Sequence, residues 1–122
     1  MEGSKKLIIL VDDNSANLRI GKNVLSEKYT VATAPSAAKL FKLLENNNPE
    51  LILLDIDMPE MDGYQTIEIL KSRQETKNIP VIFLTGMADS ENREKGRALG
   101  AVDYMTKPFD PPLLFACIDK YI

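Results

Sequence analysis

The sequence contains no histidine, only one cysteine and no long hydrophobic run. Because histidine is missing, the chain can support neither histidine acid–base catalysis nor a phosphohistidine of its own. A single cysteine excludes an internal disulfide bond. The apolar runs are about five residues long, whereas a helix that crosses a bilayer needs about 20, and Met1 to Lys6 lacks the character of a signal peptide. We therefore expect a cytoplasmic protein that has no contact with a membrane.

The sequence also has fewer positively charged residues than negatively charged ones. The 15 lysines and arginines are outnumbered by 18 acidic residues, which gives a net charge of -3. Proteins that bind nucleic acid usually carry the opposite excess, so we expect no direct nucleic-acid binding by this domain. The 122 residues, 44% of them hydrophobic, are enough for one core. We predict a single domain that spans residues 1–122.

Short apolar runs alternate along the chain with segments of helical periodicity. The runs predict strands and the intervening segments predict helices. The expected strands cover residues 7–11, 29–33, 51–54, 81–84 and 101–105, and the expected helices begin near residues 15, 36, 63, 90 and 111. The first helix should continue to about Lys28, and the fourth, which contains Gly96, should have low local stability. This alternation predicts an α/β protein with a flavodoxin-like doubly wound fold, in which five helices surround a five-stranded parallel sheet of order 2-1-3-4-5.

Residues that could handle a phosphoryl group follow four of the apolar runs. Asp12 and Asp13 follow the first run, Asp55 follows a later one, and Thr85 and Lys107 follow the last two. Because ligands bind at the carboxyl ends of the strands in an open parallel sheet, we expect these residues to meet in one crevice. Carboxylates are suitable ligands for Mg²⁺, and an ammonium and a hydroxyl could bind the oxygens of a transferred group.

Each of these residues, taken alone, also has an ordinary structural explanation. The acidic pair could cap a helix, Asp55 could form a turn, and Lys107 could simply be solvated. Pro108 would restrict Lys107 to an extended conformation that aims its ammonium across the strand ends. We also predict a cis Lys107–Pro108 bond, because cis bonds to proline usually mark tight turns.

The order and spacing of these motifs resemble the receiver domain of two-component response regulators. The resemblance covers essentially the whole chain and is carried by residues 11–14, 54–63, 84–86 and 104–109. A lone acidic pair or a lone Lys-Pro would be weak support for such a resemblance. The four segments together, in this order and each after its own strand, are highly specific.

The resemblance implies that Asp55 accepts a phosphoryl group from a sensor histidine kinase or a histidine phosphotransfer protein. It implies that Asp13 and Asp55 ligate Mg²⁺ directly, that Asp12 helps partly through water, and that the backbone carbonyl of Asp57 completes the protein ligands. Adding a dianionic group beside three carboxylates would be strongly opposed without a divalent ion.

The resemblance also implies the roles of three further residues. Lys107 would neutralise one phosphoryl oxygen and the Thr85 hydroxyl would bind another. Tyr104 matches the aromatic switch residue of the family, which turns inward when Thr85 moves toward the phosphoryl group. The protein would then be a signalling switch whose only activities are its own phosphorylation and dephosphorylation. Phosphorylation would change the surface of the fourth helix, fifth strand and fifth helix, where an output domain or effector binds. The resemblance is also compatible with a homodimer that forms on phosphorylation.

Two positions depart from the commonest family pattern. Asp57 is more often an uncharged residue, and Met87 is apolar where many relatives carry a polar side chain. Both positions border the path of an attacking water. The sequence therefore leaves the rate of dephosphorylation open.

Two other functions fit parts of the sequence. The Asp55-Ile56-Asp57 segment resembles the nucleophile and acid/base pair of haloacid-dehalogenase-type Mg²⁺-dependent phosphatases. In that superfamily, however, the nucleophile strand comes first and an acidic pair comes late, and this chain has no room for a cap domain. A flavodoxin would share the fold class, but the first strand is not followed by a loop rich in glycine, serine and threonine that could bind FMN.

Overall fold

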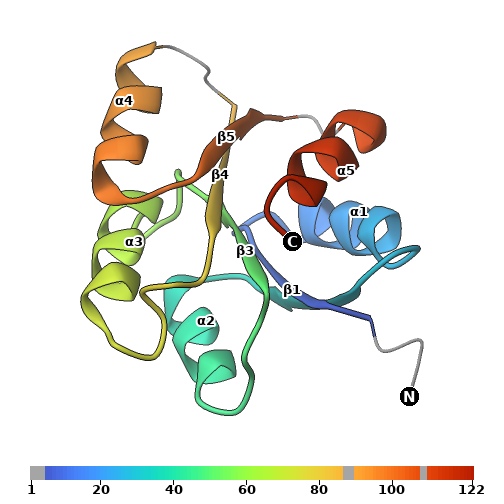
Figure 1. Cartoon of the computed structure of the whole chain (residues 1–122), viewed down its shortest axis with the longest axis horizontal. Coiled ribbons are helices and arrows are strands. Elements are labelled where there is room, and N and C mark those ends of the chain that lie inside the picture. The colour runs from blue at the N-terminus through green and yellow to red at the C-terminus, as the bar shows by residue number, and fades with distance from the viewer. Residues whose placement is uncertain (1–4, 87–89, 108–109) are drawn as a thin grey trace.

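The computed structural model describes residues 5–86, 90–107 and 110–122 (Figure 1). The predicted cis Lys107–Pro108 bond and the predicted position of Met87 beside the path of an attacking water involve residues outside these ranges. Within the described residues, no helix is both long enough and apolar enough to span a membrane.

Five strands alternate with five helices along the described chain, as the sequence predicts. The elements are β1 (Leu7–Val11), α1 (Ser15–Leu25), β2 (Thr30–Ala34), α2 (Ala37–Leu44), β3 (Leu51–Asp55), α3 (Gly63–Ser72), β4 (Val81–Thr85), α4 (Ser90–Leu99), β5 (Asp103–Thr106) and α5 (Pro111–Asp119).

The strands form one parallel sheet in the order β2-β1-β3-β4-β5, which confirms the predicted topology. Val11 pairs with Leu54 across β1 and β3, and Asp55 pairs with Leu84 across β3 and β4. Since all strands run the same way, their carboxyl ends lie at one edge of the sheet. This register places the residues that follow β1 next to the last residue of β3.

Helices cover both faces of the sheet (Figure 1). The core on one face joins alternate strand residues such as Ile9 and Phe83 to α2, α3 and α4. The core on the other face joins Ile8 and Ile82 to α1 and α5. Successive strand side chains point to opposite faces, so a strand buried on both sides reads as an unbroken apolar run. The residues at the carboxyl edge of the sheet are thereby positioned by strands that pack against helices on both faces.

Helix α1 ends at Leu25, before the predicted end near Lys28. The carbonyl of Leu25 accepts hydrogen bonds from the backbone N–H groups of both Lys28 and Tyr29. The chain turns here to enter β2, so the polar residues after Leu25 belong to a turn. Helical periodicity did not reveal this end because polar residues suit an exposed helix face as well as a turn.

The loop after β3 is held tightly against the strand at Gly63, the first residue of α3. The Gly63 N–H donates to the Ile56 carbonyl at 2.8 Å. A β-carbon at Gly63 would lie 2.6 Å from the carbonyl oxygen of Asp55 and 2.7 Å from Cα of Ile56. Such close approach between backbones leaves no room for a side chain.

Replacing Gly63 with alanine should therefore lower the free energy of unfolding by about 1–3 kcal/mol, because the start of α3 must move away from β3. Urea unfolding at neutral pH measures the change. Gly86 offers a matched control, because a β-carbon there meets no atom of the described residues within 4 Å. We expect the Gly86→Ala change to stay within about 1 kcal/mol. Equal losses in the two variants would contradict the steric explanation.

Candidate functional site

Two buried carboxylates lie side by side at the carboxyl edge of the sheet. Asp12 directly follows β1, and its N–H donates to the Ala34 carbonyl at 3.0 Å, which fixes it beside β2. Asp55 is the last residue of β3. The side chain of Asp12 is fully buried and Asp55 is 2% exposed, whereas Asp13 is exposed to solvent. Carboxylate oxygens of the three residues lie within 4.8 Å of one another, so the predicted acidic cluster is present.

Lys107 bridges the two buried carboxylates. Its Nζ lies 2.8 Å from Oδ2 of Asp12 and 3.2 Å from Oδ1 of Asp55. The backbone N–H of Lys107 donates to the Thr85 carbonyl at 2.8 Å, which keeps the residue in line with β4 just past the end of β5. One ammonium thus contacts both acidic side chains.

The other predicted site residues lie at the same edge. Thr85 is the last residue of β4, is 2% exposed and pairs with Thr106. Asp57 is exposed, and its N–H donates to Oδ1 of Asp55 at 3.3 Å. Asp55 therefore accepts from a backbone N–H on the loop that follows it as well as from Lys107.

Two asparagines that the sequence analysis missed also contact Asp12. The Asn14 N–H donates to Oδ1 at 2.9 Å, and the Asn17 side-chain amide donates to Oδ2 at 3.3 Å. Asn14 is also the N-cap of α1, where its side chain accepts from the Asn17 N–H. The spacing of a cap residue and an amide three positions later is visible in the sequence, but nothing in that spacing shows that the amide turns back to Asp12.

The electrostatics of the site follow from burial and from this crowding. The pKa of Asp55 is raised to about 6: burial is the largest cause and the negative charge of Asp12 adds to it, while the Lys107 ammonium and the Asp57 N–H oppose the rise. Burial alone would lower the pKa of Lys107, but its hydrogen bond to Asp12 and the charge of Asp55 outweigh that effect, so its pKa is raised. Lys107 therefore stays charged, while Asp55 is ionised at a cost in stability.

The donor set suits a hard divalent cation. Three carboxylates meet one ammonium here, which leaves an excess of negative charge. Oxygen ligands of this kind, with one exposed carboxylate that a hydrated ion can reach, are the type that Mg²⁺ takes in proteins. Asp12, Asp13 and Asp55 thus fit the ion that the sequence analysis expects.

The raised pKa of Asp55 predicts how stability depends on pH. The folded protein holds the Asp55 proton up to about pH 6, whereas the carboxyl of an unfolded chain releases it near 3.8. Stability should therefore fall as the pH rises through this window. Asp55→Asn, which stays neutral, should raise the free energy of unfolding at pH 7 by about 1–3 kcal/mol.

Urea unfolding of both proteins without Mg²⁺, at several pH values between 4 and 8, checks this prediction. The difference between variant and wild type cancels the other titrating groups, and it should vanish near pH 4. A difference that does not change with pH would show that Asp55 is not destabilised by ionisation.

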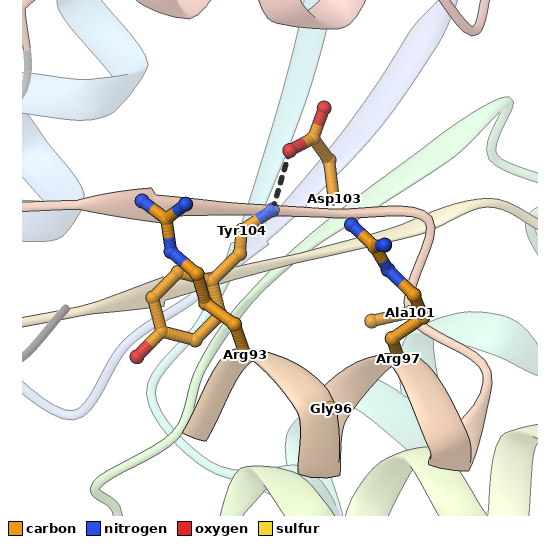
Figure 2. A pocket seen from close by; sticks show the side chains of 6 residues that line it. All are labelled: Arg93, Gly96, Arg97, Ala101, Asp103 and Tyr104. Carbon is orange, nitrogen blue, oxygen red and sulfur yellow. Dashed lines mark hydrogen bonds between the residues drawn. The ribbon is translucent and has the colours of Figure 1, made fainter. Parts of the chain in front are cut away.

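The surface that the sequence analysis predicts to change on phosphorylation lies at the edge strand β5 and the helices beside it. Figure 2 shows Arg93 and Arg97 rising from α4 toward β5, with the Arg93 side chain beside the Tyr104 ring. The Arg93 guanidinium carbon lies 5.4 Å from the ring centroid, a cation–π distance. A β-carbon at Gly96 would lie 2.7 Å from the Phe83 ring. Gly96 thus has a packing role that its helix propensity did not reveal, although the low stability expected of α4 stays a prediction.

Asp103 connects β5 to α5 on the same side of the molecule. Its carboxylate accepts from the Tyr104 N–H at 2.8 Å, from the Tyr121 hydroxyl at 2.9 Å and from the Cys117 thiol at 3.4 Å. These bonds outweigh its burial and lower the pKa of Asp103. The ionised carboxylate therefore holds α5 against the edge strand.

The sequence matches a known family over nearly its whole length. The family model of the response regulator receiver domain matches residues 8–119. A probable cyclic di-GMP phosphodiesterase of Vibrio cholerae is 41% identical over 119 residues, which are 98% of this chain and 27% of that protein. The response regulator PleD of Caulobacter vibrioides is 38% identical over 110 residues, which are 89% of this chain and 24% of that protein. The chain spans about a quarter of the length of these two relatives.

A solved structure agrees with the sequence matches. The receiver domain of the sensor histidine kinase PA1611 from Pseudomonas aeruginosa, solved with a magnesium ion coordinated in its active-site cleft, is 26% identical and has a TM-score of 0.87. The match covers 96% of this chain and 97% of that one. None of these matches supports the alternative of a haloacid-dehalogenase-type phosphatase. The chain belongs to the family of response regulator receiver domains, which are signalling switches that work with histidine kinases and output domains.

Proposed function

We propose that Asp55 accepts a phosphoryl group from a sensor histidine kinase or a histidine phosphotransfer protein, with Mg²⁺ bound beside it. The surroundings of Asp55 are the main support for this proposal. Asp55 is a buried carboxylate 3.2 Å from the Lys107 ammonium, and it shares a compact cluster with Asp12 and Asp13. We further propose that residues 1–122 form one domain that works in the cytoplasm, as family membership suggests.

In the proposed transfer, a carboxylate oxygen of Asp55 attacks the phosphorus of the donor's phosphohistidine. A phosphorus–oxygen bond forms and the phosphorus–nitrogen bond breaks, and its electron pair stays on the departing imidazole nitrogen. Lys107 would bind one phosphoryl oxygen and the Thr85 hydroxyl would donate to another. Phosphoryl transfer needs mainly positioning and charge neutralisation, so the absence of histidine from this chain is no obstacle.

In this proposal Mg²⁺ is held by the carboxylates of Asp13 and Asp55, by Asp12 partly through water, and by the backbone carbonyl of Asp57. The bound ion supplies positive charge that offsets the repulsion between a dianionic phosphoryl group and the three carboxylates. The magnesium ion in the PA1611 receiver domain supports this assignment. Hydrolysis of the phosphorylated Asp55 by water would reset the switch, so autophosphorylation and autodephosphorylation are the only activities that we propose.

Acetyl phosphate tests the proposal without knowledge of the kinase. The protein should gain the mass of one phosphoryl group when Mg²⁺ is present, and EDTA should prevent the gain. The protein should not turn over p-nitrophenyl phosphate, which a haloacid-dehalogenase-type phosphatase would hydrolyse. Failure to gain mass from acetyl phosphate, together with failure to bind beryllofluoride, would refute the proposal.

We propose that phosphorylation changes the surface formed by α4, β5 and α5, through Thr85 and Tyr104. Thr85 ends the strand next to β5, and Tyr104 packs partly buried against the core with Arg93 over its ring. An inward turn of Tyr104 would remove this contact and change the face that meets an output domain, an effector or a second copy of the chain. The matched region is only 27% and 24% of two longer relatives, which leaves room in those proteins for a separate output domain.

Hydrogen exchange with and without beryllofluoride, a phosphoryl mimic, should show this change. We expect protection of backbone amides to change several-fold within residues 90–106, because α4 presents few apolar residues to the sheet. Helix α2, on the other side of α3, serves as the internal reference and should not change. A change confined to α2, with unaltered protection in α4 and β5, would contradict the proposed switch surface.

A further inference from the structure

Helices α1 and α3 begin with the same kind of cap but use their third residue differently. In α3, Asp62 caps the helix, and the Gln65 side chain accepts the Asp62 N–H at 3.0 Å, which completes a capping box. In α1, Asn14 is the cap, but its N–H donates to Asp12 instead, at 2.9 Å. The side chain of Asn17, the equivalent of Gln65, is therefore not needed by the cap.

The side chain of Asn17 instead serves Asp12. Its amide nitrogen lies 3.3 Å from Oδ2 of Asp12, the same oxygen that accepts from Lys107 at 2.8 Å. Asp12 is fully buried and Asn17 is partly buried. Oδ2 thus has two donors, a charged one that also contacts Asp55 and a neutral one on α1.

We propose that Asn17 is a positioning residue that holds Asp12 when Lys107 moves onto a phosphoryl group; this inference rests on the proposed function. One ammonium cannot donate equally well to two carboxylates and a phosphoryl oxygen. As Lys107 turns to the phosphoryl oxygen, the buried Asp12 loses its charged donor, and a buried carboxylate with fewer donors is less stable. The Mg²⁺ ion is bound both before and after this change, so the protein donors that remain to Asp12 are the Asn17 amide and the Asn14 N–H. Asn17 therefore contributes more to the phosphorylated state than to the unphosphorylated one.

Beryllofluoride binding at saturating Mg²⁺, measured by isothermal titration calorimetry, tests this role. Asn17→Ala should weaken beryllofluoride binding about fivefold, which is the size expected for part of a hydrogen bond to a charged group. Asn17→Asp keeps the shape but replaces the donor with a negative charge, so its loss should be larger. Asn23→Ala makes the same change at an exposed position of α1 and should stay within about twofold. Mg²⁺ affinity measured alone should not fall in Asn17→Ala, because the variant removes no carboxylate.

A double-mutant cycle with Lys107→Ala separates this role from a structural one. Without Lys107, Asp12 has the same donors before and after beryllofluoride binds, so Asn17→Ala should then change the affinity by less than about twofold. An equal loss with and without Lys107, or no loss in the single variant, would overturn the inference and leave the proposed function intact. If the wild-type protein with Mg²⁺ neither bound beryllofluoride nor gained mass from acetyl phosphate, the proposed function and the inference would fail together.

Discussion

Replacing Asp55 with asparagine should abolish the Mg²⁺-dependent gain of a phosphoryl group from acetyl phosphate or from a phosphorylated donor. The amide lacks the nucleophilic oxygen, and loss of a nucleophile commonly costs at least about 10³-fold in rate. The fold should survive, because the side chain keeps its size at the end of β3 and loses a charge that burial disfavours. Intact-mass measurement, with acid lability of the bound phosphate as a second readout, checks the result.

Asp13→Ala is the matched control for this prediction. It removes an exposed carboxylate from the same cluster but keeps Asp55. Its main effect should be weaker Mg²⁺ binding, so phosphorylation should recover when the Mg²⁺ concentration is raised. Asp55→Asn should not recover at any Mg²⁺ concentration. Labelling of Asp55→Asn with a yield similar to wild type would show that another residue is the acceptor.

The gain in stability and the loss of phosphorylation that we expect for Asp55→Asn have the same physical origin. The same burial and the same neighbour, Asp12, that raise the pKa of Asp55 make its ionised form costly to the folded protein. The ionised form is also the nucleophile. A variant that is more stable at neutral pH but cannot be phosphorylated would show that the site is maintained at the expense of stability.

The acidic cluster and Lys107 could be predicted because their positions depend only on topology. Parallel strands put their carboxyl ends at one edge, so Asp12 and Asp55, at the ends of the neighbouring strands β1 and β3, must lie side by side, and the long side chain of Lys107 can reach them from the end of β5. The resemblance to receiver domains then added the roles. Those roles rest on family membership and chemistry and stay proposals until variants such as Asp55→Asn are measured.

Other features depend on local geometry that periodicity does not encode. The contact from Asn17 to Asp12 exists because Asn14 donates its N–H to Asp12, which frees the third residue of α1. Gly96 lies close to Phe83 because α4 packs tightly on β4. Each feature depends on how one helix sits on the sheet, and a pattern of apolar residues specifies only which face of the helix is buried.

Removing Lys107 should have the second large effect, on stability and metal binding together. Its ammonium is the cation that contacts Asp12 and Asp55, whose side chains are 0% and 3% exposed. Breaking one partner of a buried ion pair typically costs about 3–5 kcal/mol. Because Asp55, with a pKa of about 6, can take up a proton and relieve part of the repulsion, we expect Lys107→Ala to lose about 2–4 kcal/mol at pH 7 without Mg²⁺.

Mg²⁺ should restore much of this stability, because an ion that binds only the folded protein stabilises it in proportion to its affinity. That affinity should match or exceed wild type, since a competing cation is gone, while signalling by the variant should be impaired. Urea unfolding with and without Mg²⁺, together with calorimetric Mg²⁺ titration, measures both effects.

Lys28→Ala is the control, because it breaks an exposed ion pair with Asp119. The Lys28 side chain is 49% exposed and the Asp119 side chain is 55% exposed. Lys28→Ala should cost no more than about 1 kcal/mol and be indifferent to Mg²⁺. Equal losses in the two lysine variants, or weaker Mg²⁺ binding by Lys107→Ala, would show that Lys107 does not compensate the buried carboxylates as its contacts indicate.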